Sequence, residues 1–253
     1  HPRGSQWSYG PATDPQILER SLSDKFIHFD ADATGLYNYY GQPSQQNIQH
    51  ASRSLVWLKP DHIIIYDRAK SAQPGEFKKW CLNMPGIPTI TGTTASAVAS
   101  DGATAKGKLF VQTLLPAGAV PVAADIASGQ PAPYEDMKAR IIVSAPGDPT
   151  ETRFLHVVQA TDLAVMTGDA TQLVTSTGGA YEGAVIGTRC AMFRKTHGIN
   201  ELPLSFTVPP SVTEFIITGL ERFTGYNISN SGGNVTITSG TQRHSDGGAV
   251  LSF

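Results

Sequence analysis

Apolar and polar residues form their clearest pattern around a turn at Lys59-Pro60-Asp61. Two apolar, β-branched runs, Leu55–Leu58 and Ile63–Tyr66, flank this turn. Proline fixes φ and the Asp side chain bonds its own backbone, so the tripeptide predicts a tight reversal and an antiparallel hairpin. Since consecutive residues of a strand face opposite ways, the isoleucine triplet predicts a strand covered on both faces. Such a strand is central in a large layered β structure.

Short strand-like segments separated by Gly, Pro, Ser and Asp continue along most of the chain. Helical periodicity is limited to residues 15–22, which are typical of one short amphipathic helix. The pattern predicts an all-β fold, a multi-stranded antiparallel β-sandwich of the supersandwich type. The expected strands are residues 26–31, 53–58, 62–67, 77–82, 108–115, 139–143, 153–158, 171–175, 183–186, 190–194, 204–208, 214–218, 226–229, 234–238 and 249–253.

Three parts are expected along the chain. Residues 1–30 form an irregular lead-in, residues 31–195 the main β-sandwich, and residues 196–253 a set of C-terminal β-strands. Because no Pro/Ser/Gly linker occurs near residue 195, the C-terminal strands are expected to continue the sandwich. Within them, Asn234–Thr238 alternates strictly between polar and apolar residues, which predicts a half-exposed strand paired across the turn at residues 231–234.

The amino-acid composition disfavours two classes of binding partner. The 253 residues include only 16% charged side chains and carry a net charge of −2, which disfavours nucleic acid and anionic membranes as partners because both require clustered Lys and Arg. Abundant Thr, Ser, Gly and Asn favour a secreted or periplasmic β protein. No apolar run approaches the length of a transmembrane helix. No signal peptide is visible, so a leader is expected to have been removed or to lie upstream.

The two cysteines, Cys81 and Cys190, both occur in apolar strand-like runs. One disulfide and two buried free thiols are both compatible with these positions. Neither cysteine shows metal-ligand spacing.

Aromatic residues within the expected strands are interpreted first as core. Trp57 and Trp80 are expected in the core, with a ligand platform as the alternative. His156 is expected to be a hydrogen-bonded core histidine, with a position facing away from its apolar neighbours as the alternative.

Several segments, read in order, resemble the C-terminal β-sandwich of the heparinase II/III-like polysaccharide lyases and the related alginate lyases. Order and spacing fit that family over roughly residues 25 to 165. Each motif is a structural pattern, and none is a catalytic signature. The matching segments are Asp32-Ala-Thr-Gly-Leu-Tyr37, Arg53-Ser-Leu-Val-Trp-Leu-Lys-Pro-Asp-His-Ile-Ile-Ile-Tyr-Asp-Arg68, Phe77-Lys-Lys-Trp-Cys-Leu82, Gly107-Lys-Leu-Phe-Val-Gln-Thr-Leu-Leu-Pro116 and Arg153-Phe-Leu-His-Val-Val158.

The resemblance also implies what is missing. Members of that family carry an N-terminal α-helical toroid with most of the catalytic residues, and a His-x-His-x-Asp type segment ahead of the region where this chain begins. Neither can be identified in these residues. The resemblance therefore implies the non-catalytic sandwich of such a lyase, with a catalytic α-toroid domain upstream as a possible partner.

The residues best suited to bind sugar follow the first resembling segment. Tyr37, Asn38, Tyr39, Tyr40 and Gln42 combine aromatic faces, which stack on pyranose rings, with amides that donate and accept hydrogen bonds. Packing of these tyrosines over a strand edge is the alternative. Trp7 is a further candidate, with tethering of the lead-in as its alternative role.

A lyase mechanism needs a base for the C5 proton and a group that neutralises the carboxylate. Tyr37, His50 and Arg53 are the weak catalytic candidates for these roles. The sequence predicts no bound metal or other cofactor. A structural Ca²⁺ held by carboxylates such as Asp30, Asp32 or Asp61 is kept open as an alternative.

Three functions therefore remain open. The first is a secreted, bacterial-type module that recognises a polysaccharide, and it is favoured. The second is a polysaccharide lyase that acts on a uronic-acid glycan with residues partly on a missing or partner domain. The third is a purely structural domain.

Overall fold

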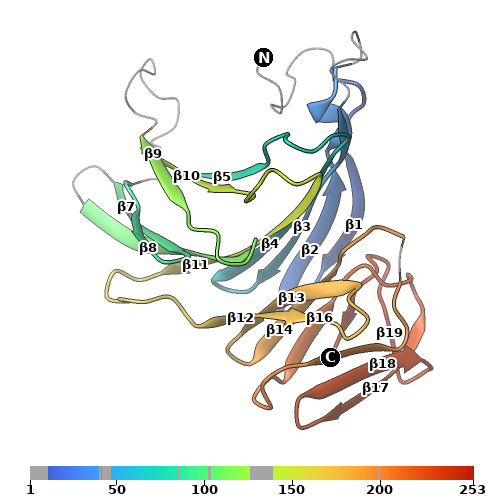
Figure 1. Ribbon diagram of the computed structural model, residues 1–253. Coiled ribbons are helices and arrows are strands. Elements are labelled where there is room, and N and C mark those ends of the chain that lie inside the picture. The colour runs from blue at the N-terminus through green and yellow to red at the C-terminus, as the bar shows by residue number, and fades with distance from the viewer. Residues whose placement is uncertain are drawn as a thin grey trace. The chain divides into compact units, whose positions relative to one another are not determined.

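The computed structural model describes residues 11–39, 41, 47–84, 86–101, 104–125, 139–198 and 200–253. Within these ranges the chain is built of β-strands and one short 3₁₀ helix, as Figure 1 shows. The predicted all-β sandwich class is confirmed. No helix of the described residues is long and apolar enough to span a membrane.

The strands divide among four sheets. Their bounds are β1 (Gln16–Leu22), β2 (Phe26–Asp32), β3 (Ile48–Leu58), β4 (His62–Ser71), β5 (Lys79–Met84), β6 (Thr89–Thr91), β7 (Thr94–Asp101), β8 (Thr104–Leu115), β9 (Val122–Asp125), β10 (Ala139–Ser144), β11 (Glu151–Thr161), β12 (Thr171–Thr175), β13 (Tyr181–Ile186), β14 (Arg189–Arg194), β15 (Leu204–Thr207), β16 (Glu214–Ile217), β17 (Gly225–Ser231), β18 (Asn234–Ser239), β19 (Arg243–His244) and β20 (Leu251–Ser252), with the 3₁₀ helix η1 at Thr34–Tyr37.

The isoleucine triplet lies in the middle of the largest sheet, as the sequence predicts. That sheet has the order β1-β2-β3-β4-β11-β8-β7-β6, and β4 carries the triplet. Ile64, Ile65 and Tyr66 are consecutive and all buried, so both faces of β4 are covered. Burial of both faces excludes a sheet border for this strand.

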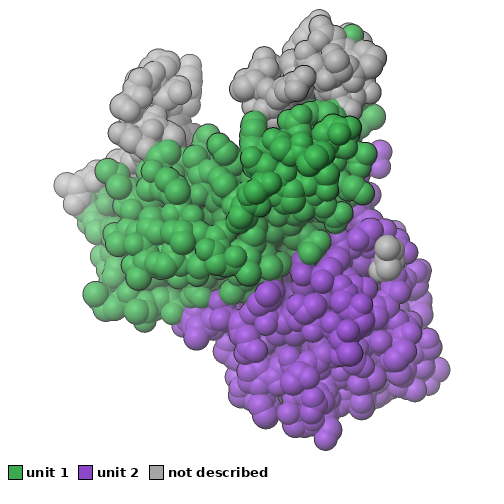
Figure 2. Space-filling model, viewed as in Figure 1, with its two compact units in different colours: residues 1–15, 33–52, 61–168 green, residues 16–32, 53–60, 169–253 purple. Residues whose placement is uncertain are grey.

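Contacts group the chain into two compact units, coloured in Figure 2. Unit 1 contains residues 1–15, 33–52 and 61–168, and unit 2 contains residues 16–32, 53–60 and 169–253. The division falls at residue 168 rather than at 195, so β12 to β14 group with the C-terminal strands. The short helix expected at residues 15–22 is wrong, because residues 16–22 form strand β1, whereas the strand expected at residues 26–31 is confirmed as β2.

In unit 1 a three-stranded sheet, ordered β5-β10-β9, packs on β11. The Trp80 ring of β5 stacks on the His156 ring of β11, with centroids 3.7 Å apart. His156 is fully buried and shares a hydrogen bond of 3.2 Å with Thr113 Oγ1. The predicted core positions of Trp80 and His156 are therefore confirmed. Trp57 differs, because its side chain is 37% exposed on the opposite face of β3 from Val56 and Leu58.

Unit 2 holds a five-stranded sheet, ordered β12-β13-β14-β16-β20, and a four-stranded sheet, ordered β15-β18-β17-β19. One core joins them, with Tyr181, Phe206, Phe215 and Tyr226 as its large aromatic members. Fully burying such a side chain contributes roughly 1.5–3 kcal/mol, so this cluster is the main source of stability in unit 2.

The two cysteines are free. Cys81 is exposed on β5, and Cys190 is buried on β14, where burial raises the pKa of its thiol to about 12.

Because the thiolate is the reacting species, we predict that a disulfide reagent at pH 8 modifies the Cys81 thiol of the native protein quickly and the Cys190 thiol only after unfolding. The measurement is a thiol titration with and without guanidinium.

Matched variants identify the reacting thiols. Cys81→Ser is expected to remove the fast phase, and Cys190→Ser is expected to leave it unchanged. Rapid modification of both thiols in the native protein would contradict the burial of Cys190.

Candidate functional site

The predicted sugar-binding stretch begins in a closed turn of unit 1. Residues Thr34–Tyr37 form η1, and the backbone N–H of Ala12 donates to Gly35 O over 3.0 Å and to Asn38 O over 2.8 Å. A Cβ at Gly35 would overlap the backbone and side chain of Thr13, so only glycine permits this close approach. The turn therefore holds Tyr37 and Tyr39 in fixed positions at its end.

Asn38 has a structural role in this turn. Its side chain is buried, its Nδ2 donates to Ile48 O over 2.8 Å and to Thr34 O over 3.3 Å, and its Oδ1 accepts the Ile48 N–H over 3.1 Å. These bonds tie the turn to the start of β3. Because both ends of the amide serve the backbone, Asn38 is poorly placed to bind a sugar hydroxyl.

Tyr37 and Tyr39 remain candidates for sugar binding. Tyr37 and Tyr39 are half-buried, and Tyr39 makes a backbone bridge to Pro11. Trp7, Tyr40 and Gln42 lie outside the described residues.

The weak catalytic candidates do not gather on one side of the sheet. His50 lies on the face of β3 that carries Ser52, and its Nε2 is 2.9 Å from Ser52 Oγ. Arg53 is three residues further and exposed, and residues an odd number apart on a strand face opposite sides. His50 and Arg53 are therefore not arranged to act on one sugar ring with Tyr37.

Two of the carboxylates suggested as calcium ligands each contact a different histidine. Asp30 Oδ2 is 2.7 Å from His197 Nε2, and Asp61 Oδ1 is 2.8 Å from His62 Nδ1. Among the described residues, no group of three or more His, Cys, Asp or Glu side chains is arranged to hold a metal ion.

A set of side chains that the sequence did not reveal lies on the outer face of the three-stranded sheet. Arg140 on β10 stands directly opposite Asn83 on β5, and its Nε donates to Asn83 Oδ1 over 2.8 Å. Lys79, at the other end of β5, is exposed on the same face because it is four residues from Asn83. Phe77 precedes it, 47% exposed, with Lys79 Nζ 5.2 Å from its ring centroid. We name Phe77, Lys79, Asn83 and Arg140 the cationic strip.

Lys78, between the two outward residues, points inward. Its Nζ donates to Ser71 Oγ over 2.8 Å, to Glu76 O over 2.9 Å and to Pro149 O over 2.5 Å. Desolvation by burial lowers the pKa of this lysine. The amine thus fixes the segment that leads into β5, and this anchoring places Phe77 and Lys79 on the solvent side.

Hydrogen bonds connect the cationic strip with the turn at Tyr37. The Ala72 N–H donates to Asn47 O over 2.8 Å, one residue before Ile48, which is bonded to Asn38. Ser71, which accepts a hydrogen bond from Lys78 Nζ, directly precedes Ala72 in the chain. The half-buried tyrosines and the start of the strip therefore belong to one end of unit 1.

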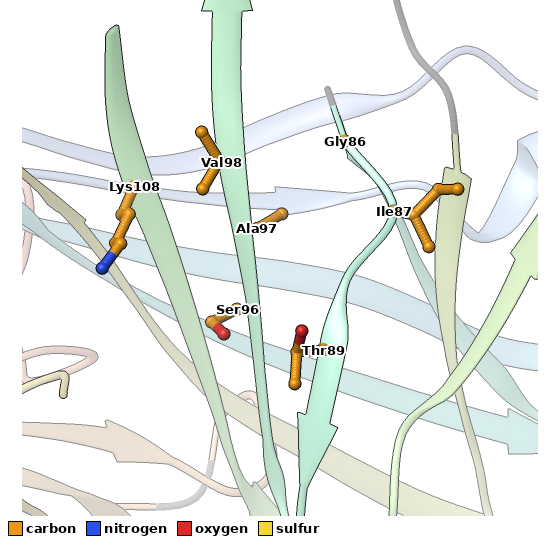
Figure 3. Close-up of a pocket in the computed structure, with 7 residues that line it drawn as sticks. All are labelled: Gly86, Ile87, Thr89, Ser96, Ala97, Val98 and Lys108. Carbon is orange, nitrogen blue, oxygen red and sulfur yellow. The ribbon is translucent and has the colours of Figure 1, made fainter. Parts of the chain in front are cut away.

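A shallow pocket of about 320 Å³ lies at the β6–β7 edge of the large sheet (Figure 3). Ile87 and Val98 give it an apolar lining, and Lys108 is its charged residue. In Figure 3 the Lys108 side chain extends away from Ile87, and its Nζ donates to Val165 O over 2.8 Å. The polar groups that remain in its lining are the hydroxyls of Thr89 and Ser96.

Solved structures similar to this chain include polysaccharide lyases. A heparan sulfate lyase, HepC from Pedobacter heparinus, aligns with a TM-score of 0.53 at 13% identity, over 74% of this chain and 29% of that one. Heparinase III, the BT4657 gene product, aligns with a TM-score of 0.50 at 12% identity, over 72% of this chain and 28% of that one. No protein-family model and no curated protein matches the sequence.

The likeness confirms, at the level of fold, the resemblance to the β-sandwich of heparinase II/III-like lyases. The chain spans less than a third of the length of these lyases.

The role assigned to Asn38 is testable by substitution. We predict that Asn38→Ala lowers the free energy of unfolding by about 1–3 kcal/mol, because buried backbone groups of Ile48 and Thr34 lose their partner. Urea unfolding followed by tryptophan fluorescence measures the change. Asn83→Ala, at an exposed position, is the control and is expected to stay within about 0.5 kcal/mol of the parent. Equal effects of the two variants would refute the structural role.

Proposed function

We propose that this chain is a secreted polysaccharide-recognising β-sandwich module, related to the non-catalytic part of a polysaccharide lyase, and that its ligand is an acidic glycan. The observation that carries the proposal is the cationic strip on the outer face of the β5-β10-β9 sheet. The similarity of the fold to a heparan sulfate lyase supports an acidic glycan as the ligand.

The strip supplies the donors that a carboxylate or sulfate group requires. Lys79 contributes an ammonium group, and Arg140 contributes a planar guanidinium whose Nε bond to Asn83 fixes its orientation. Arg140 stands opposite Asn83, which is four residues from Lys79 on β5. The backbone positions of Lys79 and Arg140 are therefore roughly 13 Å apart along the strand direction. That separation suits a polymer with repeated anionic groups better than a small anion.

Aromatic contact extends the strip. The exposed Phe77 ring offers an apolar face for a pyranose ring, and Tyr37 and Tyr39 at the same end of unit 1 extend that surface. One stacked ring contributes on the order of 1 kcal/mol, and one exposed ion pair about 0.2–1 kcal/mol. Each sugar unit is therefore bound weakly, and useful affinity depends on several units binding together.

The lyase alternative is favoured by the named activity of the structural neighbours. On this chain it would need an α-toroid domain to supply the base and the carboxylate-neutralising group, because His50 and Arg53 face opposite sides of β3. Incubation with heparan sulfate, alginate and hyaluronan distinguishes the two, since elimination creates an unsaturated sugar that absorbs in the ultraviolet. We expect no absorbance increase from this chain alone.

Binding is tested by affinity electrophoresis in gels that contain heparan sulfate or alginate. We predict that the double variant Lys79→Ala/Arg140→Ala binds about 2- to 30-fold more weakly, the loss expected for two exposed ion pairs worth roughly 0.4–2 kcal/mol together. Added salt is expected to weaken the wild type more than the variant.

The matched control is Lys25→Ala/Lys106→Ala, which removes the same charge at exposed positions that are not part of the strip. It is expected to bind like the wild type. Equal loss in both double variants would show a non-specific charge effect, and no retardation or thermal stabilisation of the wild type by any acidic glycan would favour a purely structural domain.

A further inference from the structure

The four-stranded sheet of unit 2 has two faces of sharply different chemistry. Along β15 and β18, and along β17 as far as Ile228, every second side chain points inward, and these residues belong to the core of unit 2 or pack against it, including Phe206, Tyr226, Val235 and Ile237. The residues between them point to solvent. Because strand neighbours face opposite ways and the strand pairing is known, the residues of the outer face follow from the register of β15, β17 and β18.

The first row across the outer face is made of hydroxyl groups. Thr236 on β18 stands opposite Ser205 on β15 and Ser229 on β17. The hydroxyls of Ser205 and Thr236 are 3.1 Å apart and hydrogen-bonded. Ser229 is exposed at the other side of the row.

The second row adds an amide. Asn234 on β18 stands opposite Thr207 and Ser231. Its Oδ1 accepts the Thr207 hydroxyl over 3.0 Å, and its Nδ2 donates to Ser231 O over 3.3 Å. On the other side of the first row, Thr238 stands opposite Asn227. The outer face is thus an ordered array of Ser, Thr and Asn whose cross-strand bonds restrict its rotamers.

Charge is absent from the strands that form the middle of this face. No Asp, Glu, Lys or Arg occurs between Arg222 and Arg243, a segment that contains β17 and β18 completely. The exposed faces of soluble sheets normally carry charged residues of both signs, which maintain solubility and prevent association of strands. An uncharged, regularly spaced polar face is therefore a specific chemical feature of unit 2.

We propose that this face binds an uncharged polysaccharide chain. Sugar hydroxyls both donate and accept hydrogen bonds, as do the hydroxyl and amide groups of this face, so the two surfaces match group for group. Neighbouring strands lie about 4.8 Å apart and successive rows roughly 6.7 Å apart, which gives a flat lattice of polar groups. The outward residues of β15, β17 and β18 include no cation that would compensate the lost hydration of an anionic chain, and the basic residues of this sheet, Arg243 and His244, lie on the edge strand β19.

The proposal is separate from the acidic-glycan site, which lies in unit 1 and depends on cations. Each net hydrogen bond contributes about 0.5–1.5 kcal/mol, and no aromatic side chain takes part, so binding is weak for single sugars and requires a chain that covers several rows.

The test is affinity electrophoresis in gels that contain dextran, soluble starch or hydroxyethyl cellulose. We expect at least one of these to retard the wild type. The double variant Thr236→Val/Thr238→Val keeps the β-branched shape and removes two central hydroxyls, and we expect it to lower the association constant at least about fivefold. A second variant, Ser229→Glu, adds a charge at an exposed position and is expected to weaken binding further.

The control Thr91→Val/Thr175→Val makes the same change at exposed strand positions outside the face and is expected to bind like the wild type. Lys79→Ala/Arg140→Ala is expected to bind neutral glycans normally, and the threonine variant to bind acidic glycans normally. These crossed controls separate failure at one site from failure at the other. The proposal is overturned if no neutral polysaccharide retards the wild type, or if both face variants are retarded as strongly as the control.

Discussion

The structure depends on one constraint, the need to cover both faces of β4. Ile64 and Tyr66 point to one face and Ile65 to the other, and all three are buried. His156 on β11 pairs with Ile65 and therefore shares its face, and the stacked Trp80 ring covers it. The thin β5-β10-β9 sheet is the layer that buries this face in unit 1. Its inward residues serve packing, and the chemistry of its outward residues is unconstrained by the core.

Local rules predicted the strands wherever two-residue alternation is intact. Asn234–Thr238 was expected to be a half-exposed strand after a glycine turn, and β18 follows Gly232 and Gly233, both with positive φ. Prediction failed at β1, where a helix was expected. A register shift lies between Ile17 and Glu19, and the buried residues of β1 are the polar Glu19 and Ser21, whereas Ile17 and Leu22 are exposed. The apolar residues of this segment therefore do not mark its buried face.

The candidate site was less accessible to sequence reasoning because it depends on non-local register. Asn83 and Arg140 are 57 positions apart and meet only because β5 and β10 pair in one register. Asn38 illustrates the opposite error. Its sequence neighbours suggest a sugar site, yet its amide is used by the backbone of Ile48, a partner ten residues away whose position no local pattern reveals.

The two proposed surfaces follow from the same architecture with different side chains. In each unit an inward set of large apolar residues holds a sheet in place, and the alternate outward set is free to vary without loss of the core. In unit 1 the outward positions carry a lysine, an arginine and an exposed phenylalanine, which favours binding of anionic groups. In unit 2 the outward positions of β15, β17 and β18 carry uncharged hydroxyl and amide side chains, which favours binding of neutral groups. A binding surface with such a charge preference can arise on a sandwich by substitution of exposed residues alone, without any change in fold.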